Sequence, residues 1–131
     1  MPAHYSQTPL ARQLDLRDGQ RVWFCDMPDD IEQEIAEYAL DLTIVAAPEE
    51  GVDAAHVFVA DRAKLSDLLE PLRANLAADG QIWVSWPQGS ADIDDSVIRE
   101  LGQPLGLVDT KTCDVGDGWA SLKLVIRKEL R

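Results

Sequence analysis

The side chains that could carry chemistry in this 131-residue chain are few and scattered. Its two histidines, His4 and His56, are isolated from each other and from any group with metal-ligand spacing. Ser85 lies in the run QIWVSWP, which lacks the G-x-S-x-G pattern of a nucleophile elbow. Cys25 lies in an apolar run, where a free cysteine packs as a small hydrophobic residue. The sequence therefore predicts no catalytic residue and no metal site.

The turn from Asp26 to Asp30 is where a nucleotide-binding α/β domain would hold its cofactor. It follows the apolar run RVWFC (21–25), which predicts a buried first strand, and it precedes a helical pattern. Dinucleotide-binding folds place glycines here so that the pyrophosphate can approach the backbone. This turn has no glycine, Pro28 lacks a backbone N–H, and three aspartates repel a phosphate. We therefore expect no bound cofactor.

Short β-rich runs alternate with helical patterns, which is typical of a parallel α/β sheet. Strands are predicted at residues 21–25, 42–47, 56–60, 81–86, 107–115 and 119–127. The helical patterns predict a short helix capped by Thr8, a helix capped by Asp30 with Gln33 as its capping box, a leucine-striped helix over 65–76 that Pro71 kinks or divides, and a helix capped by Asp94 or Asp95.

Three connections refine this topology. Residues 48–55 are too few for a crossover, so the strands on either side of them are not expected to be neighbours. Asp79-Gly80 predicts a turn, and Gly116-Asp117-Gly118 predicts the turn of a closing antiparallel hairpin, because no helix follows it. Core packing is the expected role of the tryptophans in the predicted strands. Strand alternation places Trp83 and Trp86 on opposite faces, and the alternative is that one of them is partly exposed.

A ligand site, if the domain has one, is expected at the carboxyl ends of the strands, as in other open α/β sheets. Asp61 and Arg62 offer an acid beside a fork of donors, and Trp86 offers a flat apolar wall. The alternative for the first two is a helix cap and a solvated base. The predicted pocket residues are Asp26, Met27, Asp61, Arg62, Ser85, Trp86 and Gln88.

Composition narrows the partners. Asp and Glu number 24 against 12 Lys and Arg, a net charge of −12. Such acidity argues against nucleic acid and anionic membranes as partners, and it either keeps the domain soluble or attracts a basic partner or cationic ligand. Two cysteines outside any CxxC motif favour a reducing cytoplasm. The start resembles no signal peptide, and no apolar run reaches the roughly 18 residues of a membrane span.

The order of the predicted strands, ending in a hairpin, resembles a class I methyltransferase fold, and HVFVADRAKLSDLLEPLRANLAADGQIWVSW carries the best match. Over its whole length the chain resembles an uncharacterised bacterial family of small proteins, a domain of unknown function. The segments HYSQTPLARQLDLRDGQRV, IWVSWP and GLVDTKTCDVGDGWASLKLVIRK carry that resemblance. It implies a fold but no reaction.

The resemblance also marks two positions. Methyltransferases typically bind the cofactor's ribose through an acid after the second strand, a role that Glu49 or Glu50 could imitate, although a solvated loop acid is the favoured alternative. Lysines often follow the WP in the small-protein family, whereas this chain has Gln88-Gly89. A cationic role at that position is therefore in doubt.

These observations predict one three-layer Rossmann-like α/β domain over residues 1–131, with a mainly parallel sheet of about six strands and a C-terminal antiparallel hairpin. The leading functional hypothesis is a non-catalytic, cytoplasmic, methyltransferase-like module that binds a protein partner or small ligand and needs no cofactor. The alternatives are a degenerate S-adenosylmethionine-dependent methyltransferase and a self-associating structural domain that uses the hairpin or outer strand as its interface.

Overall fold

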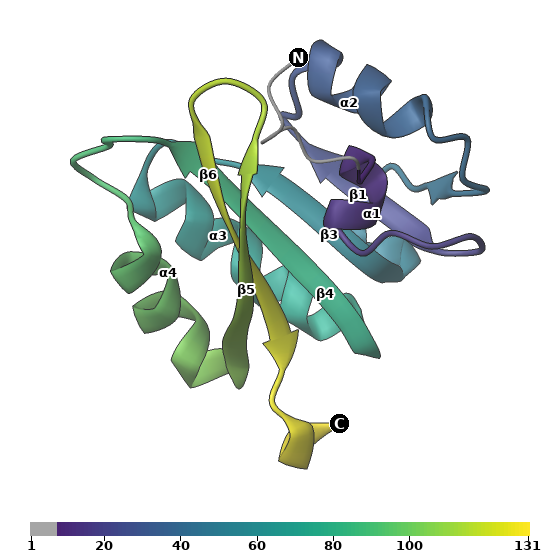
Figure 1. The fold of residues 1–131 in the computed structure, drawn as a ribbon. Helices are drawn as coiled ribbons and strands as arrows, with labels where there is room; N and C mark the ends of the chain where they lie inside the picture. Colours follow the sequence, from purple (N-terminus) through teal and green to yellow (C-terminus); the bar gives the residue numbers. More distant parts are fainter. Residues whose placement is uncertain (1–7) are drawn as a thin grey trace.

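The computed structural model describes residues 8–131, and its β-rich runs form one six-stranded sheet (Figure 1). The strands are β1 (Arg21–Cys25), β2 (Thr43–Ile44), β3 (Val52–Phe58), β4 (Leu76–Pro87), β5 (Leu107–Val115) and β6 (Trp119–Ile126). Their order in the sheet is β2-β1-β3-β4-β6-β5. The first four are parallel, whereas β6 is antiparallel to both β4 and β5. The predicted fold class and closing hairpin are confirmed.

Strands β2 and β3 are not neighbours, as the short connection between them predicted. Strand β1 lies between them, with Val22 opposite Ile44 on one side and Ala54 on the other. The connection contains the 3₁₀ helix η1 (Pro48–Glu50), and the Glu50 carboxylate accepts hydrogen bonds from the backbone of Ala46 and Ala47. This compact connection allows β3 to pass the end of β1 and pair on its far side.

Helices cover both faces of the sheet. They are α1 (Leu10–Gln13), α2 (Asp29–Ala36), α3 (Arg62–Asn75) and α4 (Asp95–Gly102), with the 3₁₀ helices η2 (Gln103–Leu105) and η3 (Lys128–Leu130) nearer the carboxyl terminus. Buried side chains of α1 and α2 pack with one set of strand residues, and those of α3 and α4 pack with the other. We call these the α1–α2 face and the α3–α4 face. No described helix is long and apolar enough to cross a membrane.

Helix starts differ from the prediction at two places. Helix α2 starts at Asp29 with Pro28 as its N-cap, so Asp30 is not the cap, and α1 starts after Pro9 rather than after Thr8. In both cases the proline carbonyl accepts the first backbone hydrogen bonds of the helix, which a side-chain capping pattern does not reveal. Asp94 caps α4 as predicted, because its carboxylate accepts from the Val97 N–H.

Helix α3 runs unbroken through Pro71, so the prediction that this proline divides it is wrong. Leu65, Leu69 and Leu72 are all buried along one face of the helix. Burying three leucines contributes several kcal/mol, more than the roughly 3 kcal/mol that an interior proline costs.

Strand boundaries also shift. Strand β3 starts at Val52 rather than at His56, and β2 is shorter than the predicted 42–47. Strand β4 starts at Leu76 and includes Asp79-Gly80, which was predicted as a turn. The pairing with β3 jumps from Val52–Leu76 to Ala54–Gln81, so residues 77–80 form an irregularity within a continuous strand.

Trp83 and Trp86 lie on opposite faces, as predicted. Both are buried, so the expected core packing is confirmed for these two and the alternative that one is partly exposed is wrong. The α1 segment covers the first, and the second packs in the cluster of the α3–α4 face.

Candidate functional site

The turn after β1, which the sequence predicts to hold no cofactor, carries an ion pair and a side chain that packs on the core. Asp26 adopts the left-handed conformation with φ of 55°, which an L-residue other than glycine rarely takes. Its carboxylate forms an ion pair with Lys64 in the first turn of α3, and this hydrogen bond raises the pKa of Lys64. Met27 packs against the core of the α1–α2 face. Lys64 and the core of the α1–α2 face therefore hold the first two residues of the turn.

The tip of the β5–β6 hairpin lies against α2 beside this turn (Figure 1). A Cβ atom added to Gly116 would lie 3.2 Å from the Cδ1 atom of Ile31, so the hairpin backbone packs closely against the Ile31 side chain of α2. On the other side of the tip, the Gln88 N–H donates to the Gly118 carbonyl at 2.8 Å. The hairpin thus ties the exposed Gln88 to the end of the sheet.

Asp61 and Arg62, also predicted for the pocket, have structural partners. The Asp61 carboxylate caps α3 by accepting from the Lys64 N–H at 2.8 Å. The Arg62 guanidinium forms an ion pair with Glu100 of α4 at 2.8 Å, which raises the pKa of Arg62 and lowers that of Glu100. The Arg62 N–H donates to Asp92. These contacts match the alternative of a helix cap and a surface base.

Ser85 and Trp86 point away from each other. Ser85 is fully buried on the α1–α2 face, opposite Phe58, whereas Trp86 packs in the cluster of the α3–α4 face. The structure therefore brings Asp26, Asp61 and Arg62 to one edge through Lys64 and α3, but it does not bring all seven predicted residues to one surface. Whether this edge binds a ligand stays a prediction.

A buried chain of three polar side chains crosses the middle of the sheet. His56 Nε2 lies 2.6 Å from the Ser85 hydroxyl, which lies 2.5 Å from the Ser121 hydroxyl. The His56 ring stacks on Phe58, with ring centroids 4.5 Å apart. Burial lowers the pKa of His56 to about 3, so the ring is neutral at pH 7. The serines are too deeply buried to attack a substrate, and the chain fixes the register of β3, β4 and β6.

His56 makes stability depend on pH. Its pKa is about 3 in the folded state against an ordinary 6.5, so only the unfolded chain binds this proton in between. Stability is therefore lost as the pH falls below about 6.5, by about 1.4 kcal/mol per pH unit from this group. Urea denaturation of wild type and His56→Gln between pH 7 and 4 measures the difference, because the variant lacks the slope that His56 adds. Parallel curves would contradict the assignment.

Neither cysteine is a candidate nucleophile. Burial raises the pKa of both the Cys25 and the Cys113 thiol, so both stay protonated near neutral pH. They lie on β1 and β5, which are separated by three strands, and both are free thiols. No group of three or more metal-ligating side chains occurs among residues 8–131.

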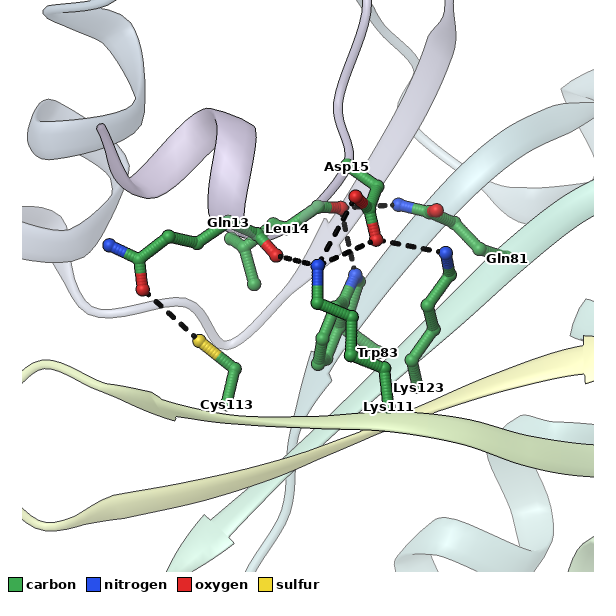
Figure 2. A network of polar contacts seen from close by, with 8 residues as sticks. All are labelled: Gln13, Leu14, Asp15, Gln81, Trp83, Lys111, Cys113 and Lys123. Atoms are coloured by element: carbon green, nitrogen blue, oxygen red, sulfur yellow. Dashed lines mark hydrogen bonds and ion pairs between the residues drawn. The ribbon is translucent and has the colours of Figure 1, made fainter. Parts of the chain in front are cut away.

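The best-defined polar arrangement in the structure is one that the sequence did not indicate. The backbone leaves α1 in a corner at Leu14 and Asp15, which lies over β4, β6 and β5 (Figure 2). The Leu14 carbonyl accepts two buried hydrogen bonds, at 2.7 Å from Gln81 Nε2 and at 2.9 Å from Trp83 Nε1. We call residues 13–15 and these two side chains the α1 corner.

Asp15 in this corner is left-handed, with φ of 58°, and two lysines hold it. Lys123 Nζ lies 2.9 Å and Lys111 Nζ 3.2 Å from its carboxylate, and Lys111 also donates to the Gln13 carbonyl (Figure 2). Partial burial alone would raise the pKa of Asp15, but the hydrogen bonds and charges of Lys123 and Lys111 outweigh it, and the pKa lies below its ordinary value. Asp15 therefore stays ionised at neutral pH.

A cavity of about 410 Å³ opens beside the α1 corner. Its volume lies within the range of small-molecule sites. It is polar rather than apolar, and the charged or amide side chains that line it are Arg12, Asp15, Arg17, Asp79, Gln81 and Lys123.

Solved structures with a similar fold include several methyltransferases. The magnesium protoporphyrin IX methyltransferase of Synechocystis PCC 6803, solved with bound SAM, has a TM-score of 0.54 at 10% identity and covers 84% of this chain and 71% of its own. The ribosomal protein L11 methylase of Lactobacillus delbrueckii subsp. bulgaricus has a TM-score of 0.56 at 13% identity, with 88% and 74% covered. The fold is therefore methyltransferase-like.

No curated protein matches the sequence. The model of the family described as protein of unknown function (DUF3052) matches residues 11–128, so the chain belongs to that family. The resemblance of the chain to a family without an assigned reaction, and to the methyltransferase fold, is confirmed.

Proposed function

We propose that this domain is a non-catalytic, methyltransferase-like module that binds a small ligand or a protein partner. The observation that carries the proposal is the glycine-free turn after β1. A cofactor needs backbone there that it can approach, whereas this turn has Asp26, Met27 and Pro28 in place of glycines, and Pro28 has no backbone N–H. A ligand of the Asp26 carboxylate would have to compete with Lys64.

The competing function is a degenerate methyltransferase that holds S-adenosylmethionine without glycines. The fold favours it, because one structure of similar fold contains SAM. The acidity of this turn does not count against it, since the sulfonium and amine of the cofactor are cationic. Its cost would be steric: Met27 would have to leave the core of the α1–α2 face, and Asp26 would have to leave Lys64.

Thermal denaturation with S-adenosylmethionine or S-adenosylhomocysteine separates the two. We expect no change in the melting temperature of the wild type up to millimolar cofactor. A saturable rise in the melting temperature would contradict the proposal. The contradiction would be most direct if the rise were larger in Lys64→Gln, because this variant frees the Asp26 carboxylate. Arg99→Gln, which removes the surface ion pairs of Arg99 with Asp95 and Asp109, is the control.

The setting of the module also belongs to the proposal. The two free thiols on separated strands support a reducing cytoplasm as its compartment. The net charge of −12 supports a cationic or dipolar ligand, or a basic partner protein, rather than nucleic acid or an anionic membrane. Strand β5 forms one edge of the sheet, and light scattering tests whether the domain self-associates there.

A further inference from the structure

The cavity beside the α1 corner collects charges of both signs, and they indicate its ligand. We propose that it binds a small dipolar molecule that carries a phosphate or carboxylate at one end and an amine at the other. The inference rests on the proposed function, because it names the ligand class and the place for the small-ligand form of the module. It moves that place from the carboxyl edge of the sheet to the side of β4 and β6 beneath α1.

The anion-binding end is indicated by Arg12 and Arg17, whose side chains contact no carboxylate or backbone carbonyl among the described residues. Of the 12 lysines and arginines, nine engage a carboxylate or a backbone carbonyl through their side chains. Among residues 8–131, only Arg12, Arg17 and Lys128 have no such contact. Two of these three line this one cavity. In a chain with twice as many acids as bases, unpaired arginines that share a cavity are available for an anion.

Carboxylates line the space next to these arginines. A second hollow of about 280 Å³ shares Arg17 and Asp79 with the first and is also lined by Asp18 and Asp53. Each of these two accepts one backbone N–H, from Asp41 and Arg21 respectively, which leaves lone pairs free. The Asp79 side chain has no hydrogen bond or ion pair among the described residues. A simple anion would meet repulsion from Asp79, whereas an amine on the same molecule pairs with it.

The arginines extend from a rigid support. Arg12 and Arg17 flank the α1 corner, whose Leu14 carbonyl is fixed by two buried donors of β4. Asp15 between them is neutralised by Lys123 and Lys111, so it does not cancel the two arginine charges. A backbone anchored in this way reduces the entropy lost when the side chains bind a ligand.

Isothermal titration of the full chain tests this site. The probes are phosphoethanolamine and β-alanine, which share the amine and differ in the anion. Inorganic phosphate and ethylamine, which carry charge of one sign only, are the single-charge controls. We expect saturable binding of at least one dipolar probe, and weaker binding of both single-charge probes. Comparing the two dipolar probes shows whether phosphate or carboxylate is preferred.

Variants show whether the binding is at this cavity. The double substitution Arg12→Gln and Arg17→Gln should lower the affinity for the dipolar probe by at least about tenfold. Lys128→Gln, which removes the remaining unpaired cation among the described residues, should leave that affinity unchanged. Asp79→Asn should lower the affinity for the dipolar probe and raise the affinity for inorganic phosphate. Both arginines are exposed, and circular dichroism confirms that the variants fold.

The outcomes separate the two proposals. Absence of binding by both dipolar probes, or equal binding to the double arginine variant and to Lys128→Gln, overturns this site but leaves the non-catalytic module standing. Binding of S-adenosylmethionine overturns the module whatever the amine probes do.

Discussion

Replacing Trp83 with alanine is expected to lower the free energy of unfolding by about 3–5 kcal/mol. Its side chain is 1% exposed and packs beneath the α1 corner, with its ring centroid 6.4 Å from that of His56. The substitution leaves a large cavity and removes one of the two donors to the Leu14 carbonyl. Urea denaturation at pH 7 measures the loss, which we expect to be the largest for any single residue of the corner.

Trp83→Phe is the matched control, because it keeps an aromatic ring in the core and removes the indole N–H together with the rest of the five-membered ring. The Leu14 carbonyl retains its bond from Gln81, so the hydrogen-bond loss should cost about 1 kcal/mol. The remaining difference between the two variants reports the packing. A loss below about 1 kcal/mol for Trp83→Ala would show that the α1 corner does not pack on β4 as described.

Gly80→Ala is expected to destabilise the domain by about 1–3 kcal/mol through overpacking. A Cβ atom there would lie 2.8 Å from the Asp53 carbonyl oxygen and 2.7 Å from the Leu76 Cδ1 atom. The end of the Leu76 side chain can move, but the Asp53 carbonyl is part of the backbone of β3. Relief therefore requires a shift between two paired strands, and thermal or urea denaturation measures its cost.

Gly118→Ala separates this steric effect from a conformational one. Gly118 has φ of 88°, and a Cβ atom there meets nothing within 4 Å. Its substitution should cost about 1–2 kcal/mol from the backbone conformation alone. The pairing of the strands in Gly118→Ala should stay as in the wild type at all temperatures below its melting temperature. If Gly80→Ala were neutral, the close approach of β3 to residues 77–80 would be wrong.

The sequence predicted the fold because its signals are local and repeated. Apolar runs such as residues 21–25 and 107–115 identified strands, and the short segment 48–55 correctly separated β2 from β3. The first half of β3, Val52–Ala55, was missed because a run of small and acidic residues has little strand propensity. It is a strand because β1 and β4 pair with it from both sides.

The candidate sites were harder to predict, for a physical reason. The carboxyl edge was located from a general rule, and the structure places Asp26 and Asp61 there, each in contact with Lys64, but ligand binding at this edge stays a prediction. The α1 corner has no local signal, because Asp15 meets Lys111 and Lys123 only after the sheet is complete.

The position of β6 has a consequence for how the protein is made. The last strand of the chain is an inner strand, between β4 and β5. It also supplies Lys123 to Asp15, a contact that spans 108 positions. A growing chain on the ribosome therefore cannot complete this sheet until β6 has emerged, and contacts of such long range form slowly. Chains truncated before Trp119 should stay open to proteases.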